Sequence, residues 1–221
     1  MKLYDLEISG NCYKIRLFLS LLGLPYQRIP VNTKAGESKR PEFLRLNPRG
    51  QLPALEDDGV VVWDSASILV YLARRYGGDK WFPSEAREAA EVSRWLGISQ
   101  QAEINMGGLS RARAVTLFGV KGDLADLRER GRHFLQFLDR YMKGRSWIAL
   151  ERPTIGDIAC YPYIALAPDG GVSLKEFAEL NAWFGRIRAL PGYVPLPQPT
   201  PDNISKASGP TGPGLAPVPR S

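Results

Sequence analysis

Thiols and imidazoles are scarce in this sequence. The 221 residues include two cysteines, Cys12 and Cys160, and one histidine, His133. Two thiols are too few for a disulfide scaffold, and neither has a partner at the C-x-x-C spacing of a dithiol redox motif. A single histidine in the second half of the chain argues against a Ser-His-Asp triad and against a Cys/His metal site. We therefore expect no metal, and a reducing, cytoplasmic location.

Long apolar runs and basic runs are also missing. No stretch approaches the ~20 apolar residues of a membrane span, and the first ten residues lack the apolar core of a secretory signal. The net charge is +6, but lysine and arginine are mixed with aspartate and glutamate, without the clustered basic patch typical of nucleic-acid binding. We expect neither a membrane nor a nucleic acid as a partner, whereas a mildly basic surface suits small anions.

The apolar patterns that are present divide the chain into two unlike halves. In the first half they predict strands over 2–8, 26–31, 52–56 and 60–63, and helices over 11–22, 41–46 and 65–76. The tripeptide Asp57-Asp58-Gly59 predicts a hairpin between the last two strands. A strand–helix–strand unit followed by a hairpin and a helix implies a mixed sheet with helices on its faces.

The second half shows helical periodicity only. Helices are predicted over 84–105, 123–142, 154–166 and 174–189, and Thr154 with Asp157 resembles a capping box at the start of the third. We therefore predict an α/β domain over 1–77, a linker over 78–84 and an all-α domain over 85–192. Residues 193–221 are rich in proline, glycine and serine. From residue 195 on we expect an extended or mobile tail or, if ordered, one lying on the protein's own surface or on a partner.

The most informative stretch is 47–65, NPRGQLPALEDDGVVVWDS. The Leu52-Pro53 step is either a strand-start proline, which the low general frequency of cis bonds favours, or a cis bond that exposes the Leu52 backbone to an extended peptide. Asp64 or Ser65 caps the next helix by default. The ligand-binding alternative is that the helix N-terminus and Ser65 hold a carboxylate while Asp64 takes an ammonium. An α-amino-acid head group carries both charges.

A second candidate stretch, Ser9-Gly10-Asn11-Cys12, lies between the first strand and the first helix. Ser9 or Asn11 can cap that helix. Alternatively, Ser9 donates a hydrogen bond to a bound sulfur, with Asn11 as a second donor. Cys12 is either a reactive thiol whose pKa the helix N-terminus lowers, or a small residue packed at the helix start.

Together these motifs resemble the cytosolic glutathione S-transferases over about residues 1–192. The resemblance rests on NPRGQLPAL, the Asp-Asp-Gly turn, WDSASILVYLARRYG and TIGDIACYPYI. The stretch SGNCYKIRLFL is similar to bacterial members, of a nu-like or related class, that place Ser or Thr and then Asn near the glutathione sulfur. The family implies a thioredoxin-like N-terminal domain, an all-α C-terminal domain and a homodimer.

The resemblance also implies roles for individual residues. Ser9 and Asn11 would stabilise the glutathione thiolate, and Asp64 and Ser65 would hold the γ-glutamyl head. Leu52, before a cis Pro53, would pair its backbone with the cysteinyl unit, and Lys39 and Gln51 would approach the glycine end. Thr154 and Asp157 would form a structural helix cap. The second substrate would sit between the turn at 6–8 and the helices around 104–111, against Leu6, Ile8, Ile104, Met106 and Arg111.

These roles predict a detoxifying glutathione transferase that directs a bound thiolate at an electrophile or a disulfide. A thiol with a pKa of ~8.5 needs only ~2.7 kcal/mol to lower that pKa by ~2 units. Two charge-assisted hydrogen bonds and a helix N-terminus can supply it. The alternatives are a glutathione-dependent disulfide reductase or peroxidase, and a non-catalytic binding module of the same fold.

Overall fold

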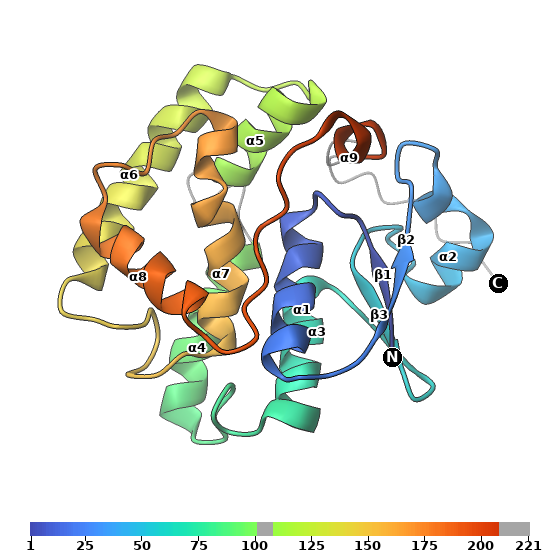
Figure 1. The fold of residues 1–221 in the computed structure, drawn as a ribbon, viewed down its shortest axis with the longest axis horizontal. Coiled ribbons are helices and arrows are strands. Elements are labelled where there is room, and N and C mark those ends of the chain that lie inside the picture. Colours follow the sequence, from blue (N-terminus) through green and yellow to red (C-terminus); the bar gives the residue numbers. More distant parts are fainter. Residues whose placement is uncertain (101–107, 208–221) are drawn as a thin grey trace.

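The computed structural model describes residues 1–100 and 108–207, and in it the two halves of the chain lie side by side (Figure 1). The first half is built on a four-stranded sheet of β1 (Lys2–Asp5), β2 (Gln27–Pro30), β3 (Ala54–Asp57) and β4 (Val60–Trp63). The strand order is β2-β1-β3-β4; β1 and β2 are parallel and the other pairs are antiparallel. The predicted element order and mixed sheet are confirmed.

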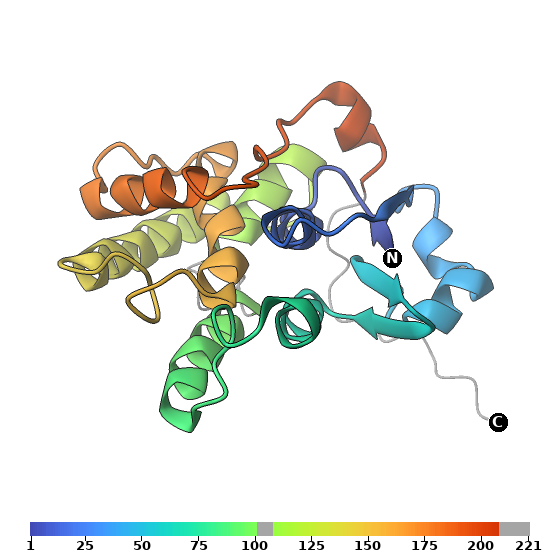
Figure 2. The same ribbon diagram turned by 60° about the horizontal axis from the view of Figure 1, so that its bottom comes forward.

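Helices cover both faces of this sheet. α1 (Gly10–Leu21) and α3 (Ser65–Leu72) lie on the face toward the second half, and α2 (Pro41–Leu46) lies on the other (Figure 2). Strand β1 is shorter than predicted, because residues 6–8 turn back and the Ser9 N–H donates to the Leu6 carbonyl at 3.0 Å. This turn brings the chain into α1 at the edge of the sheet.

The hairpin predicted from Asp57-Asp58-Gly59 is present. Asp58 and Gly59 both have positive φ, 49° and 79°. Positive φ at both central residues is the condition for a tight two-residue turn that matches the twist of the strands. Asp57 pairs with Val60 across this turn and Ala54 with Trp63 at the far end, so β4 leads directly to the start of α3.

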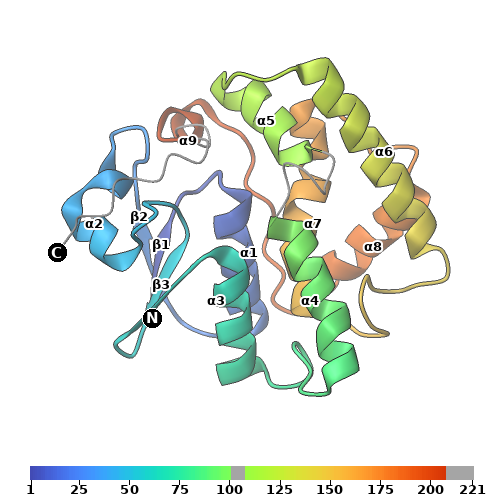
Figure 3. The same ribbon diagram turned by 180° about the vertical axis from the view of Figure 1, so that it is seen from behind.

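The second half is helical, with α4 (Ala86–Gln100), α5 (Leu109–Phe118), α6 (Leu124–Met142), α7 (Ile155–Ala165) and α8 (Ala178–Arg188) (Figure 3). α7 is almost wholly buried and packs against α1 and α4. The capping box is confirmed: the Asp157 carboxylate accepts from the Thr154 N–H at 2.9 Å, and Trp183 Nε1 donates to it at 3.0 Å. Asp157 is therefore a structural residue.

In its described part, the segment after α8 follows the ordered alternative of the prediction and lies on the protein's own surface. Tyr193, Val194 and Leu196 pack against the core, and the Tyr13 hydroxyl donates to the Val194 carbonyl at 2.6 Å. A short helix, α9 (Pro201–Ser205), follows, with its own capping box between Thr200 and Asn203. Residues 193–207 thus cross from the second half back to the loop after β2, while 208–221 lie outside the described residues (Figure 1).

None of the helices described over 1–100 and 108–207 is long and apolar enough to cross a membrane.

Candidate functional site

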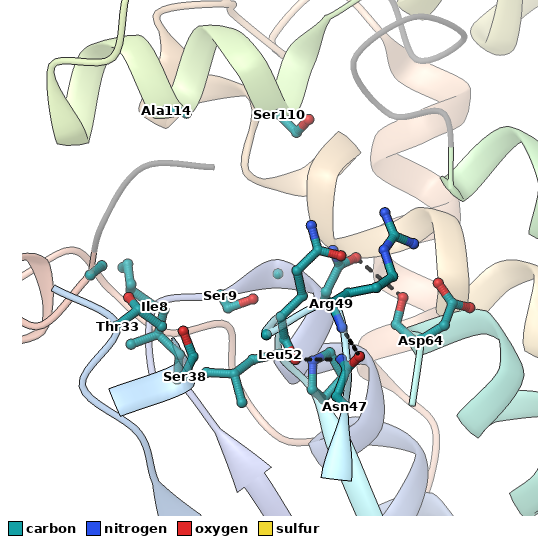
Figure 4. Close-up of a pocket in the computed structure, with 18 of the residues that line it drawn as sticks. Ile8, Ser9, Thr33, Ser38, Asn47, Arg49, Leu52, Asp64, Ser110 and Ala114 are labelled. Atoms are coloured by element: carbon teal, nitrogen blue, oxygen red, sulfur yellow. Dashed lines mark hydrogen bonds between the residues drawn. The ribbon is translucent and has the colours of Figure 1, made fainter. Parts of the chain in front are cut away.

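A cavity of about 680 Å³ opens between the two halves of the molecule. The loops after β1, before β3 and after β4 form one wall; α5 and α7 contribute the other, so that Ser110 and Ala114 lie across from Ser9 and Leu52 (Figure 4). Ten of the predicted site residues line this one cavity: Leu6, Ile8, Ser9, Asn11, Lys39, Gln51, Leu52, Pro53, Asp64 and Ser65.

The start of α1 supplies the first corner of the cavity. Ser9 is the N-cap, and its Oγ accepts from the Cys12 N–H at 3.3 Å. Accepting leaves the hydroxyl proton available, so Ser9 keeps a donor for a ligand. The Asn11 Oδ1 lies 3.3 Å from the Ser65 hydroxyl. Its NH₂ group is therefore the side of the amide that suits an acceptor.

Cys12 does not line the cavity with these residues. It is fully buried, and the Leu6 N–H donates to its Sγ at 3.4 Å. Burial, followed by the nearby charge of Asp5, raises the pKa of the Cys12 thiol to about 12. A thiol with so high a pKa is not the activated thiolate that one alternative required, so the geometry favours the packing interpretation.

The start of α3 supplies the second corner. Asp64 has φ +76°, an uncommon conformation for a residue with a side chain and one that clusters at ligand sites. Its Oδ1 accepts from the N–H groups of Ala66 and Ser67, both at 3.1 Å, so Asp64 is the N-cap. Its Oδ2 accepts from the side-chain amide of Gln100, whose oxygen lies 3.3 Å from the Ser65 hydroxyl. The sequence interpretation missed Gln100, because it stands at the end of α4 in the other half.

The loop before β3 connects these corners. The Leu52-Pro53 peptide bond is cis. The family resemblance implied this conformation, whereas the low general frequency of cis bonds favoured trans. Asn47 is buried and holds the loop, since its Nδ2 donates to the Gln51 carbonyl at 2.8 Å and its Oδ1 accepts from the Arg49 N–H at 3.0 Å. Neither Asn47 nor Arg49 was among the predicted site residues, although both lie in the stretch 47–65 that was singled out from the sequence.

A lysine fixes the outer side of the same loop. Lys39 Nζ donates to the Arg49 carbonyl at 3.0 Å. Gly50, at φ +58°, lies so close that a Cβ there would meet the Ser38 carbonyl at 2.6 Å. The Lys39 ammonium is therefore held at the cavity rather than left on a free loop.

The opposite wall corrects one prediction. Arg111 is not among the described residues that line the cavity; its guanidinium donates to the Lys121 carbonyl at 2.7 Å. Arg113 lines the cavity instead. Since successive helical residues are ~100° apart, two positions along α5 lie on nearly opposite faces. Ile104 and Met106, also predicted here, lie outside the described residues.

The charges of the site favour a ligand that is both anionic and ammonium-bearing. Among the described residues that line the cavity, Asp64 is the one carboxylate, and Lys39, Arg49 and Arg113 are the three cationic side chains. Within residues 1–100 and 108–207, no group of three or more histidine, cysteine, aspartate or glutamate side chains is arranged to hold a metal ion.

Comparisons with known proteins point to one family. The profile of the glutathione S-transferase N-terminal domain matches residues 8–75, and that of the C-terminal domain matches residues 115–191. A curated relative, glutathione S-transferase D7 of Drosophila melanogaster, is 27% identical over 201 residues, 87% of each chain. Two solved structures are similar as well. A possible glutathione S-transferase from Rhodopseudomonas palustris has TM-score 0.77 and 36% identity over 90% of each chain. A glutathione S-transferase from Pseudomonas fluorescens has TM-score 0.80 and 33% identity over 88% of this chain and 98% of the other.

Proposed function

Because the chain belongs to the glutathione S-transferase family, we propose that its cavity binds glutathione along residues 47–65, with the sulfur at the start of α1. The chain is an enzyme, a glutathione transferase. One observation carries the assignment of the site. All eight residues predicted to hold glutathione, which come from four separate segments of the chain, line the same cavity.

The two corners of the cavity suit the two ends of a γ-glutamyl head. The Asp64 carboxylate takes the ammonium, and the Ser65 hydroxyl with the N–H groups at the start of α3 takes the carboxylate. The Leu52 backbone pairs with the cysteinyl unit as an added strand does. Lys39, held on the Arg49 carbonyl, and Gln51 face the glycyl carboxylate.

The start of α1 then acts on the sulfur. The Ser9 hydroxyl donates to the thiolate, and the Asn11 NH₂ group is the second donor. Hydrogen bonds to the charged form lower a pKa, and ~2.7 kcal/mol lowers that of a thiol by ~2 units. The thiol proton leaves to solvent. The thiolate forms a carbon–sulfur bond with the electrophile, and the leaving group departs with its bonding electrons.

Calorimetry with glutathione and two assays on the purified protein test this proposal. We expect binding, and glutathione-dependent conjugation of a chlorinated dinitrobenzene. Disulfide or peroxide reduction without conjugation would instead support the reductase or peroxidase alternative. Binding without turnover of any substrate would support the non-catalytic module, and absence of binding would overturn the site.

We also infer a homodimer, which is common in this family, and a cytoplasmic location stays a prediction. Strand β4 is at the edge of the sheet and exposes Val60, Val61 and Trp63. An exposed apolar edge strand is a liability that proteins usually cover. Sedimentation should give a dimer for the wild type and a larger monomer fraction for Val60→Lys with Val61→Lys; a wild-type monomer would contradict the inference.

A further inference from the structure

Arg113 is a buried cation in the wall that faces Ser9. It lies on α5, is only 4% exposed, and lines the cavity with Ile8, Ser110 and Tyr163. Its Nε donates to Asp169 Oδ2 at 2.9 Å, and its Nη1 donates to the Ile8 carbonyl at 3.2 Å. The guanidinium therefore joins α5 to the residue that immediately precedes Ser9.

One nitrogen of this guanidinium lacks an acceptor. Nη2 is buried and has no hydrogen-bond partner among the described residues. A guanidinium has five N–H donors and always carries its charge. Leaving a buried charged donor unpaired is unfavourable, and each such group in a native protein calls for an explanation. The site is thus complete only when an acceptor approaches Nη2.

The side chain cannot readily turn away to find that acceptor elsewhere. Asp169 and the Ile8 carbonyl hold it at two nitrogens. The helix that carries it is also fixed, because a Cβ at Gly170 would lie 2.9 Å from the Arg113 backbone nitrogen. A donor held in place before the ligand arrives loses little freedom on binding, which favours a specific interaction.

The acceptor belongs to the second substrate rather than to glutathione. The charged groups assigned to the two ends of glutathione, Asp64 and Lys39, come from the first half of the chain. Arg113 comes from the second half and meets the cavity next to the sulfur position at Ser9. We propose that Arg113 selects second substrates that carry a carboxylate or sulfonate beside the electrophilic carbon; this rests on the transferase function proposed above.

A matched pair of substrates tests this inference on the full-length protein. The pair is 2-chloro-3,5-dinitrobenzoate, whose carboxylate stands beside the carbon that carries the chlorine, and its methyl ester, which lacks that charge. Each kcat/KM is divided by the rate of the uncatalysed reaction with glutathione, which removes the difference in ring reactivity. One charge-assisted hydrogen bond predicts a ~10-fold to 100-fold preference for the carboxylate in the wild type.

Three variants locate that preference. Arg113→Met should bring it close to one, and Arg113→Lys should keep part of it, since the charge remains without the fork geometry. Arg111→Gln is the matched control, because it removes a guanidinium two residues away on the same helix that does not line the cavity. It should leave the preference unchanged.

The outcomes separate this inference from the function beneath it. Equal normalised rates for both substrates in the wild type overturn the inference but leave the transferase function intact. A preference that survives Arg113→Met has the same meaning, and so does a fall in kcat/KM in that variant that is equal for both substrates. No glutathione binding and no turnover of either substrate overturn the proposed function itself. If Arg113→Met fails to fold, inhibition of the wild type by the two conjugates decides: tighter binding of the carboxylate conjugate supports the inference, and equal binding overturns it.

Discussion

The two walls of the cavity are made in different ways. The wall assigned to glutathione consists of helix caps and turns, and apart from Ser9, Asn11 and Lys39 its residues follow one another closely between 47 and 65. The opposite wall consists of single residues from helix faces, such as Ser110 and Arg113 of α5 and Tyr163 of α7. A cap or a turn is specified by its neighbours in sequence, whereas a helix face is specified by packing. The first wall is therefore a local structure and the second is a tertiary one.

The largest expected effect tests the wall made of caps. Asp64→Ala removes both the carboxylate for the ammonium and the N-cap of α3, so we expect the Kd for glutathione to rise ~100-fold, which is ~2.7 kcal/mol, and the protein to lose ~1 kcal/mol of stability. Calorimetry and thermal unfolding measure the two effects.

Two controls sharpen the test of Asp64. Asp64→Asn keeps a capping oxygen but not the charge, so it should lose most of the affinity with little change in stability. Lys39→Ala should weaken binding far less. Equal affinities for the wild type and Asp64→Ala would remove Asp64 from the head-group site.

The next effect concerns Lys14, which lies where α1 meets α7. Its Nζ is buried without a hydrogen-bond partner among the described residues and stands 5.4 Å from the centre of the Tyr163 ring. Burial lowers the pKa of Lys14 to about 8. Lys14→Met should therefore raise the free energy of unfolding at pH 7 by ~2 kcal/mol, because it removes a buried charge and keeps the straight chain.

The pH dependence of Lys14→Met has a definite sign. Below pH about 8 the amine is protonated in the folded and the unfolded chain, so the penalty for burying the charge is complete. Between about 8 and the ordinary value of 10.5 only the unfolded chain keeps the proton, so wild-type stability gains from this group as pH rises. The advantage of the variant should shrink over that range in urea unfolding curves. Lys121→Met, at an exposed position, should show no such trend.

Ser9→Ala is expected to act on the reaction rate and, because Ser9 caps α1, to cost ~1 kcal/mol of stability. Loss of the donor to the thiolate should lower the conjugation rate at neutral pH ~10-fold and raise the pKa seen in the pH–rate profile by ~1 unit. Ser110→Ala removes a hydroxyl from the opposite wall and should leave that pKa where it is. An unchanged profile in Ser9→Ala would transfer the chemistry to Asn11.

The smallest expected effect concerns Gln100, a residue of the second half that contacts the head-group residues of the first. In this structure the Gln100 amide donates to Asp64 Oδ2, and its oxygen lies 3.3 Å from the Ser65 hydroxyl. These are the groups assigned to the ammonium and carboxylate of the head group, so Gln100 competes with the ligand. Gln100→Ala should lower the Kd for glutathione ~2-fold to 5-fold, with part of the Gln100 bonds recovered elsewhere. Weaker binding in calorimetry would make Gln100 a ligand-holding residue instead.

Much of the first wall could be predicted from sequence, because caps and turns are specified by residues close by in the chain. The hairpin at Asp58-Gly59 and the caps at Ser9, Asp64 and Thr154 depend on residues two or three positions away, and the structure has each of them. The cis bond before Pro53 is a partial exception, because the bare frequency of cis peptides argued for trans and the family resemblance was needed.

The remaining features depend on contacts that a linear pattern does not contain. Which arginine of α5 faces the cavity depends on how that helix is rotated against α7, and the prediction from sequence was Arg111 where the structure has Arg113. Gln100 meets Asp64 only because α4 ends beside α3. The composition of residues 193–221 predicted a tail, yet Tyr193, Val194 and Leu196 anchor its beginning to the core. Burial of three apolar side chains thus orders the start of a segment whose overall composition, over 29 residues, is typical of a mobile tail.

The segment 193–207 has a mechanical consequence. The polypeptide joins the two halves at residues 78–85 and returns through 193–207, where the Lys206 carbonyl accepts from the Lys34 N–H at 3.3 Å and Ala207 lines the cavity. Because the chain connects the two halves at two places, they cannot separate by rotation about a single hinge. Large ligands must therefore enter through the existing opening of the cavity. Proteolytic cleavage within 193–207 would remove the second connection and let the two halves move relative to each other, while every cavity residue before 193 stays in the chain.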